Sequence, residues 1–237
     1  MVEGFDRIVL GVPDLAGAVD QLAVLLGATP CEPPYSGGPA RAWLDLSNTV
    51  LELVQRDADA AAIEGLVLLD RASGEADSRV GNPLGLDIAL CDGSRTARFR
   101  SLFPGAVAGC SVDHLVVRSA DAQACIALFG MGLGIRLALD RTAPEWGGRM
   151  LFFRAGGMTL EVIEPRDEPV AGTAFWGVAY RHPDLDALCA SLAARGVRTS
   201  AVREGRKPGT RVATVKSHCL GIPTLLIEPG GRVIAQP

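Results

Sequence analysis

An internal repeat constrains the fold of this chain more than any other feature. Residues 5–27 read as an apolar strand, a Pro-Asp break and a helix with apolar residues every three or four positions. The same order of strand, break and helix returns at residues 112–132 and at residues 175–196. A chain built from repeated units of this kind folds as repeated supersecondary modules, so the position of a residue within its module predicts its place in the fold.

Each predicted helix begins directly after an aspartate, namely Asp14, Asp121 and Asp184. An aspartate at this position accepts hydrogen bonds from the free N–H groups of the first helical turn. Gly27 and Gly196 stand where two of these helices are expected to end, because glycine readily adopts the left-handed conformation that closes a helix.

Short extended runs separated by Gly and Pro follow each helix, which predicts strands joined by tight antiparallel turns. The recurring unit is therefore βαβββ. A second, shortened copy is expected between the first and third, with residues 64–70 as its first strand and residues 83–90 as its last. We predict an α+β fold of cupped, mixed but mostly antiparallel sheets with the helices outside, divided into an N-terminal unit (1–110, second module reduced) and a C-terminal unit (111–237).

The short first strand, the Asp-Leu helix entry and the closing strands LELV, LEVIEP and LLIEP resemble those of the vicinal oxygen chelate superfamily. This superfamily contains glyoxalase, bleomycin-resistance and extradiol dioxygenase proteins, and the resemblance covers nearly the whole chain. It implies the fold more specifically than the reaction, since the superfamily includes isomerases, lyases, dioxygenases, transferases and binding proteins.

The resemblance also implies where metal ligands stand, with one on the first strand of a module and one on its last strand. In the third module these positions are His114, seven residues before the helix cap, and Glu161. In the first module the same positions hold Arg7 and Glu52. Because a guanidinium cannot bind a cation, Arg7 and Glu52 are expected to form an ion pair in place of the metal.

The remaining modules match this pattern less well. The last module has Gly177 and Leu225 at the two positions, and the shortened module has Gly65 and Asp87. If the third module faces the shortened one, His114, Glu161 and Asp87 converge as metal ligands; if it faces the last module, only the first two remain. The two-histidine, one-carboxylate set of an iron dioxygenase is absent in either case.

Two further segments are candidates for substrate binding. Trp146 and Arg149 stand at the entry to an inner strand, where an indole and a guanidinium line the mouth of a cup, and Trp176 lies beside the vacant Gly177 position. Arg206 and Lys207 belong to a basic hairpin that can hold a carboxylate or phosphate. An ordinary packing tryptophan and a solvated hairpin tip are the structural alternatives.

The charge and hydropathy of the sequence exclude some classes of binding partner. The net charge of −4 comes from interspersed signs without a basic face, so nucleic acid is not an expected partner. No apolar run is long enough to span a bilayer and the first residues do not resemble a secretory signal, so we expect no membrane association and a cytoplasmic location. The six cysteines lie in apolar contexts without a CxxC pair, which is typical of reduced, buried thiols. The expected partner is a small molecule, bound by a monomer or a homodimer.

Two functional hypotheses follow from the resemblance. In the first, His114 and Glu161 hold a divalent ion (Mn²⁺, Ni²⁺, Zn²⁺, Fe²⁺ or Mg²⁺) and catalyse a lyase or isomerase reaction by stabilising an enolate or similar oxyanion, with Glu161 or a bound water moving the proton. In the second, the protein is a metal-free binding or sequestering protein of the bleomycin-resistance type, whose cup encloses an organic ligand next to Trp146 and Trp176. A dioxygenase is the third alternative.

Overall fold

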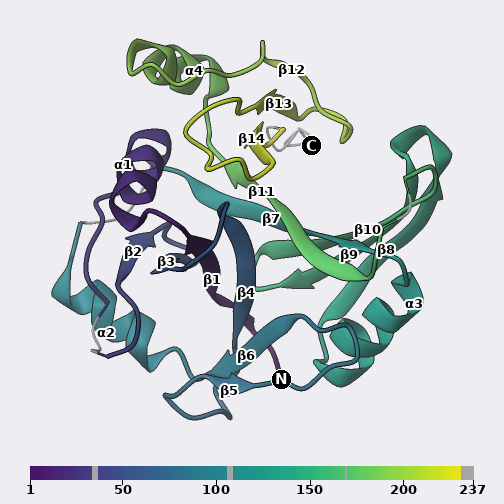
Figure 1. The fold of residues 1–237 in the computed structure, drawn as a ribbon. Helices are drawn as coiled ribbons and strands as arrows, with labels where there is room; N and C mark the ends of the chain where they lie inside the picture. Colours follow the sequence, from purple (N-terminus) through teal and green to yellow (C-terminus); the bar gives the residue numbers. More distant parts are fainter. Residues whose placement is uncertain (34–36, 106–108, 169, 231–237) are drawn as a thin grey trace, which may run out of the picture.

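The computed structural model describes residues 1–33, 37–105, 109–168 and 170–230 of the chain. Within them the strands form two mixed sheets that follow each other along the sequence (Figure 1). No helix in these residues is both long and apolar enough to cross a membrane. The predicted α+β fold of cupped sheets is confirmed, whereas the boundary between the two units at residue 110 stays a prediction.

The first sheet has the order β2-β3-β1-β4-β6-β5. Its strands are β1 (Gly4–Val12), β2 (Arg41–Asp45), β3 (Val50–Gln55), β4 (Ala62–Leu69), β5 (Ser78–Arg79) and β6 (Asp87–Cys91). Helix α1 (Leu15–Leu26) follows β1, and α2 (Ser94–Leu102) follows β6. The shortened second module is thus β4, β5 and β6, with no helix between β4 and β5 in this described stretch.

The second sheet has the order β12-β13-β14-β11-β7-β10-β9-β8. The third module contributes β7 (Ser111–Ser119), α3 (Ala122–Cys125) with its π-helical continuation η1 (Ile126–Gly132), β8 (Arg136–Ala143), the 3-10 turn η2 (Pro144–Trp146), β9 (Gly148–Ala155) and β10 (Met158–Pro165). The last module contributes β11 (Thr173–Arg181), α4 (Leu185–Ala194), β12 (Arg203–Glu204), β13 (Arg211–Thr214) and β14 (Thr224–Glu228).

The helix starts lie where the sequence predicts them. The carboxylates of Asp14, Asp121 and Asp184 each accept a hydrogen bond from the backbone N–H three residues later. Gly27 adopts the left-handed conformation after α1, and Gly196 does so shortly after α4 ends. The capping pattern therefore identified the start of each of these three helices correctly.

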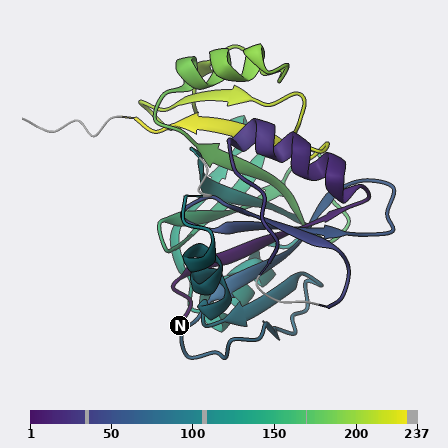
Figure 2. The same ribbon diagram turned by 90° about the vertical axis from the view of Figure 1, so that its left-hand side faces the viewer.

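One apolar core joins the two sheets. It includes Leu51 and Leu66 from the first sheet, Leu115 and Leu160 from the second, and Leu25 from α1. Figure 2 shows α1 beside the C-terminal strands. The faces of the sheets that carry the predicted ligand positions point away from this core, because side chains alternate between the two faces along each strand.

The two ligand-bearing faces differ in what covers them. In the first sheet α2 packs on this face: the Phe99 ring meets Trp43 edge-on at 5.0 Å, and Arg100 binds the buried carboxylate of Asp45 through two hydrogen bonds. The expectation that all helices lie outside is wrong for α2. The apolar Trp43 on the inner face explains the difference, because it is buried only when the helix covers it.

Candidate active site

The third module pairs with the last module, through β7 and β11 in antiparallel register, and not with the shortened one. His114 lies on β7 and Glu161 on the neighbouring strand β10, where His114 is opposite Thr159 and Glu161 is two residues further on. Both side chains therefore lie on the same face of the sheet. The imidazole Nε2 of His114 is 3.4 Å from a carboxylate oxygen of Glu161.

A β-bulge adds a second carboxylate to this pair. Val112 is opposite Tyr180 and His114 is opposite Ala179, which leaves Asp113 as the extra residue on β7. The bulge brings the Asp113 carboxylate to 3.0 Å from Nδ1 of His114. The imidazole thus lies between two carboxylates, one at each ring nitrogen. The sequence analysis did not identify Asp113, and its position next to His114 was the only available signal.

The two carboxylates have opposite electrostatic environments. Burial is the largest influence on Glu161 and raises its pKa, while the charges of His114 and Arg206 partly oppose this effect. Burial alone would also raise the pKa of Asp113, but the hydrogen bond and charge of His114, with smaller contributions from Arg181 and Arg154, lower it below the ordinary value. Two carboxyl groups whose pKa values are moved apart around one imidazole are an arrangement suited to acid–base chemistry.

The matching site of the first sheet contains an ion network instead. Arg7 has no exposed side-chain surface, and its guanidinium donates hydrogen bonds to Glu52 at 3.2 Å and to Asp6 and Asp77. Burial alone would lower the pKa of Arg7, but the surrounding carboxylates raise it. The predicted ion pair of Arg7 with Glu52 is confirmed. Asp6 is the extra residue of a bulge in β1, as Asp113 is in β7, so the two modules share their backbone irregularity.

Asp87 is not part of the candidate site. It lies on β6 in the first sheet, opposite Gly65, and its carboxylate accepts a hydrogen bond from Arg79 at 3.0 Å. The position that matches Glu161 in this module is Ala89, two residues further along the strand. The convergence of Asp87 with His114 and Glu161 would have required the third module to pair with the shortened one, and it pairs with the last.

Among the residues that the structure describes, no three His, Cys, Asp or Glu side chains are grouped so that they could hold a metal ion. The two available donors nevertheless have a suitable separation, since ligand atoms about 2.0–2.2 Å from one tetrahedral ion lie roughly 3.3–3.6 Å apart. A carboxylate on the second nitrogen of a histidine is also a usual companion of metal-bound imidazole. His114 and Glu161 therefore fit an ion that water and substrate complete, and Gly177 and Leu225 add no donor from the last module.

The predicted substrate-binding residues lie on both faces of the sheet. Trp146 lies beside Arg206, whose guanidinium is 5.9 Å from the centre of its ring and whose charge acts on Glu161. Trp176 is 43% exposed, and the guanidinium of Arg118 lies 5.7 Å from its ring. Lys207 is exposed. Its backbone carbonyl accepts hydrogen bonds from the N–H and the hydroxyl of Thr210.

Arg149 lies on the opposite face from the candidate site. It is opposite Glu164, three residues from Glu161, and side chains alternate along the strand. Its guanidinium donates to Asp140 at 2.9 and 2.7 Å and to Gln123 of α3 at 3.3 Å. The prediction that Arg149 lines the mouth of the cup is therefore wrong, because a shift of one residue along a strand moves a side chain to the other face.

Two hollows of the surface lie away from this pair. One of about 340 Å³ is lined by Asp6, Thr96 and Arg100 at the start of α2, and one of about 250 Å³ by Cys110 and Arg181. Neither is lined by His114 or Glu161. We base the candidate active site on the grouping of titratable side chains, because a hollow alone supplies no acid or base.

Comparisons with known proteins agree with the fold. A family model described as the Glyoxalase/Bleomycin resistance protein/Dioxygenase superfamily matches residues 113–214. A mutant 4-hydroxymandelate synthase from Streptomyces coelicolor is similar over 96% of this chain and 92% of its own, with a TM-score of 0.70 and 16% identity. Methylmalonyl-CoA epimerase from Mycobacterium tuberculosis is 24% identical over 53% of this chain and 91% of its own, with a TM-score of 0.45. No curated protein sequence gives a significant match.

Proposed function

We propose that this chain, whose residues 113–214 belong to the glyoxalase/bleomycin resistance/dioxygenase superfamily, is a lyase or isomerase that moves a proton on a small oxygenated substrate. One observation carries the proposal. Glu161 is buried on the ligand-bearing face of the second sheet, its pKa is raised by that burial, and its oxygen is 3.4 Å from an imidazole. A carboxylate with a raised pKa is a stronger base than an exposed one, which suits it to remove a proton from carbon.

The neighbouring side chains have complementary roles in this proposal. Glu161 removes a proton from the carbon next to a carbonyl group. His114, in the form that carries a proton on both ring nitrogens, donates a hydrogen bond from Nε2 to the oxygen on which negative charge develops. Asp113 accepts a hydrogen bond from Nδ1 of His114 and so orients Nε2 toward Glu161 and the substrate. Asp113 is therefore a positioning residue and not a catalytic one.

A divalent ion, when held by His114 and Glu161, would supply a Lewis acid that polarises the substrate oxygen. The two protein donors are fewer than the three usual in catalytic zinc sites, so we expect such an ion to exchange readily and to be lost to a chelator. The donor set does not fit a dioxygenase iron, because the last module offers Gly177 and Leu225 and so no second histidine.

The test measures proton transfer directly. Wild-type protein is incubated in D₂O with a panel of small 2-oxo acids and 1,3-dicarbonyl compounds, with and without Mn²⁺, Ni²⁺ or Zn²⁺, and deuterium on carbon is measured by mass spectrometry. We expect exchange that Glu161→Gln reduces by about 10²- to 10⁴-fold. Lys216→Gln, which removes an exposed charge from the C-terminal segment, serves as the control. Equal exchange by wild type and Glu161→Gln would refute the role of Glu161.

A metal-free binding protein is the second candidate function. It is favoured by the absence of any ligand-type side chain at Gly177 and Leu225 and by the exposed indole of Trp176 beside them. Saturable binding of a panel compound without any deuterium exchange, under all metal conditions, would support this function against the first.

A further inference from the structure

The Arg206 guanidinium, like those of Arg154 and Arg181, has no carboxylate within 4.0 Å among the described residues. Three other arginines of the second sheet form ion pairs: Arg118 with Glu168, Arg141 with Glu145 and Arg149 with Asp140. Arg206 has no such pair in the described part of the chain, and its guanidinium lies near the aromatic ring of Trp146. Its N–H donors are therefore available to a ligand.

The indole ring of Trp146 forms a cation–π contact with this guanidinium. The Arg206 guanidinium lies 5.9 Å from the ring centroid, and Arg141 lies over the same ring at 4.5 Å. Contact with an aromatic face limits the orientations of a guanidinium while leaving the N–H groups at its edge free. The contact therefore orients Arg206 without using its hydrogen-bonding capacity.

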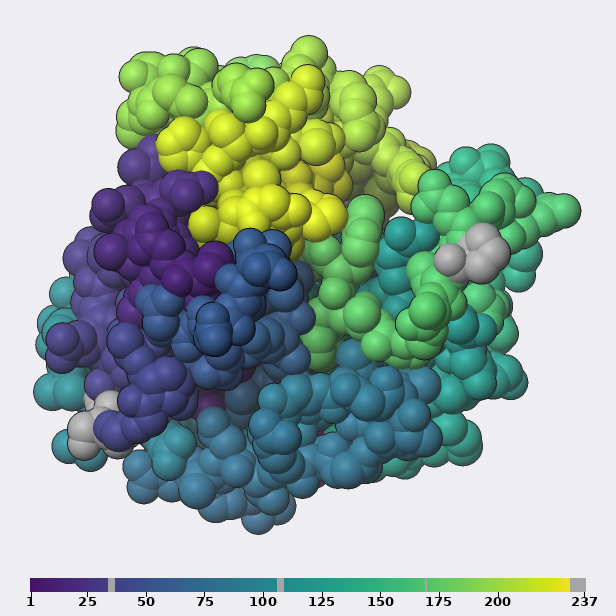
Figure 3. All heavy atoms as spheres, viewed as in Figure 1, coloured from purple at the N-terminus to yellow at the C-terminus, as the bar shows by residue number. Residues whose placement is uncertain are grey.

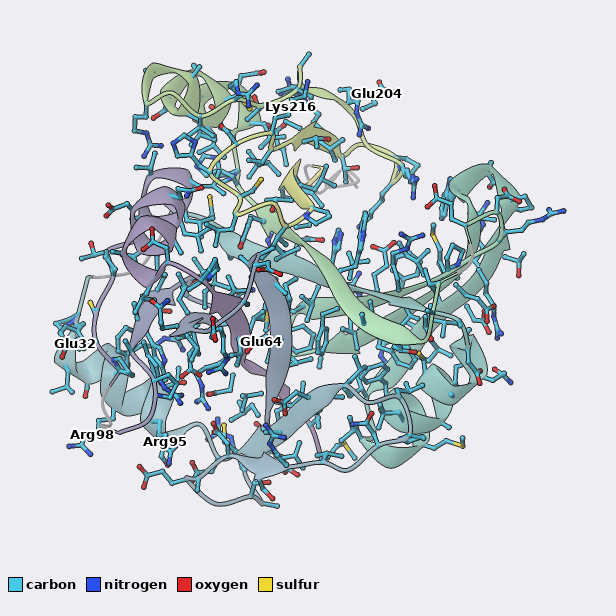
Figure 4. All side chains as sticks on the ribbon, viewed as in Figure 1. Glu32, Glu64, Arg95, Arg98, Glu204 and Lys216 are labelled. Atoms are coloured by element: carbon cyan, nitrogen blue, oxygen red, sulfur yellow. The ribbon has the colours of Figure 1, made fainter. Side chains whose placement is uncertain are left out.

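Backbone hydrogen bonds hold the loop that carries Arg206. The N–H of Gly205 donates to the carbonyl of Thr210 at 2.8 Å, and the Thr210 hydroxyl donates to the carbonyl of Lys207 at 2.6 Å. Figure 4 labels Glu204, where this loop leaves β12. Figure 3 shows the surface indented between the C-terminal segment and the β8–β9 region. The loop that carries Arg206 is thus held in place beside an indentation of the surface.

Arg206 is also within electrostatic reach of the acid–base pair. Its charge opposes the effect of burial on the pKa of Glu161, as the charge of His114 does. An oxygenated molecule that reaches Glu161 therefore passes within the influence of a guanidinium that lacks a partner.

We propose that Arg206, supported by Trp146, binds the carboxylate of the substrate, so that the substrate is a small monocarboxylic acid whose oxygen-bearing carbon lies at His114 and Glu161. This inference rests on the proposed function, since it assigns a substrate class to the same site. A monoanion fits better than a phosphate dianion, because the charge of Arg206 already acts on the Glu161 carboxylate, which repels additional negative charge.

The experiment compares lactate with lactamide, its neutral counterpart of nearly equal shape, and with inorganic phosphate. Binding is followed by tryptophan fluorescence, and Trp146→Phe identifies the signal of the relevant indole. We expect saturable binding of lactate that Arg206→Gln weakens on the order of 10- to 100-fold, the usual range for a lost charge-assisted hydrogen bond. Arg206→Lys should restore it only in part, and Lys216→Gln should leave it unchanged.

Glu161→Gln separates this inference from the proposed function. Removing the nearby negative charge should strengthen lactate binding while abolishing deuterium exchange. If binding depends on Arg206 but no exchange occurs with any substrate, the reaction is refuted and the carboxylate site stands. Equal binding of lactate and lactamide, tighter binding of phosphate than of lactate, or full binding by Arg206→Gln would overturn the inference.

Discussion

The buried arginine of the first sheet allows a quantitative test of the difference between the two matching sites. Arg7→Met keeps an unbranched side chain but removes the guanidinium from the carboxylates of Asp6, Glu52 and Asp77. The first two carboxylates have only 3% side-chain exposure, so water cannot solvate them fully after the change. Glu52 keeps one partner, because Arg41 donates to it at 2.8 Å.

Removing one partner of a buried ion pair costs about 3–5 kcal/mol of unfolding free energy. The remaining bond from Arg41 places our expectation near the lower limit, about 3 kcal/mol. A chain of this length has an unfolding entropy of about 0.5 kcal/mol/K, so the loss corresponds to a melting point lower by about 6 °C. Protonation of these carboxylates at low pH removes negative charge that the guanidinium no longer balances in the variant, and so favours its folded state. The deficit should therefore shrink as the pH falls from 7 toward 4.

Urea and thermal unfolding at pH 5 and pH 7.5 measure both effects. Arg56→Met is the matched control. Arg56 also forms a short ion pair, with Glu64 at 2.8 Å, but both side chains of this pair are about one-third exposed. The control should lose less than about 1 kcal/mol. Equal losses in the two variants, or a deficit for Arg7→Met that does not depend on pH, would show that the network contributes no more than a surface pair. Lactate binding should be unchanged in both folded variants.

Two further predictions concern the candidate active site. Glu161→Gln should raise the unfolding free energy at pH 8 by about 0.5–2 kcal/mol, because a group with a raised folded pKa loses its stabilising contribution as the pH rises through that value. Urea unfolding should show a smaller increase in stability at pH 5. A lower stability of the variant at both pH values would contradict the raised pKa of Glu161. In the wild type, added Zn²⁺, Ni²⁺ or Mn²⁺ should raise the melting temperature and EDTA should reverse the rise. His114→Ala should abolish this rise, while lowering the unfolding free energy without metal by about 1 kcal/mol or less. A wild-type melting point insensitive to all three ions would contradict the metal hypothesis.

Local sequence patterns predicted the modules and their registers. The aspartate caps located the helices, and the offset of seven residues from the cap placed His114 and Arg7 at equivalent positions, which their shared bulges support. The closing strands likewise placed Glu161 and Glu52 at equivalent positions. Capping and alternation depend on residues a few positions apart, so they can be read without knowledge of the tertiary contacts.

Register within the shortened module could not be predicted in the same way. Asp87 was chosen as the matching carboxylate, but the structure has Ala89 at that position and pairs Asp87 with Arg79. The missing helix removed the cap from which the offset is counted. Arg149 was misplaced for a related reason, because a one-residue shift within a hairpin decides which face a side chain occupies.

The sequence by itself therefore determined the modules, their helix starts and the pairing of Arg7 with Glu52 and of His114 with Glu161. Only the tertiary structure decided that the third module pairs with the last, that α2 covers the inner face of the first sheet, and that Asp113 and Arg206 act on His114 and Glu161. The physical reason is the range of the interactions. Caps and strand alternation are set by neighbours in the sequence, whereas module pairing, β-bulges and the approach of a distant loop depend on contacts between residues far apart in the chain.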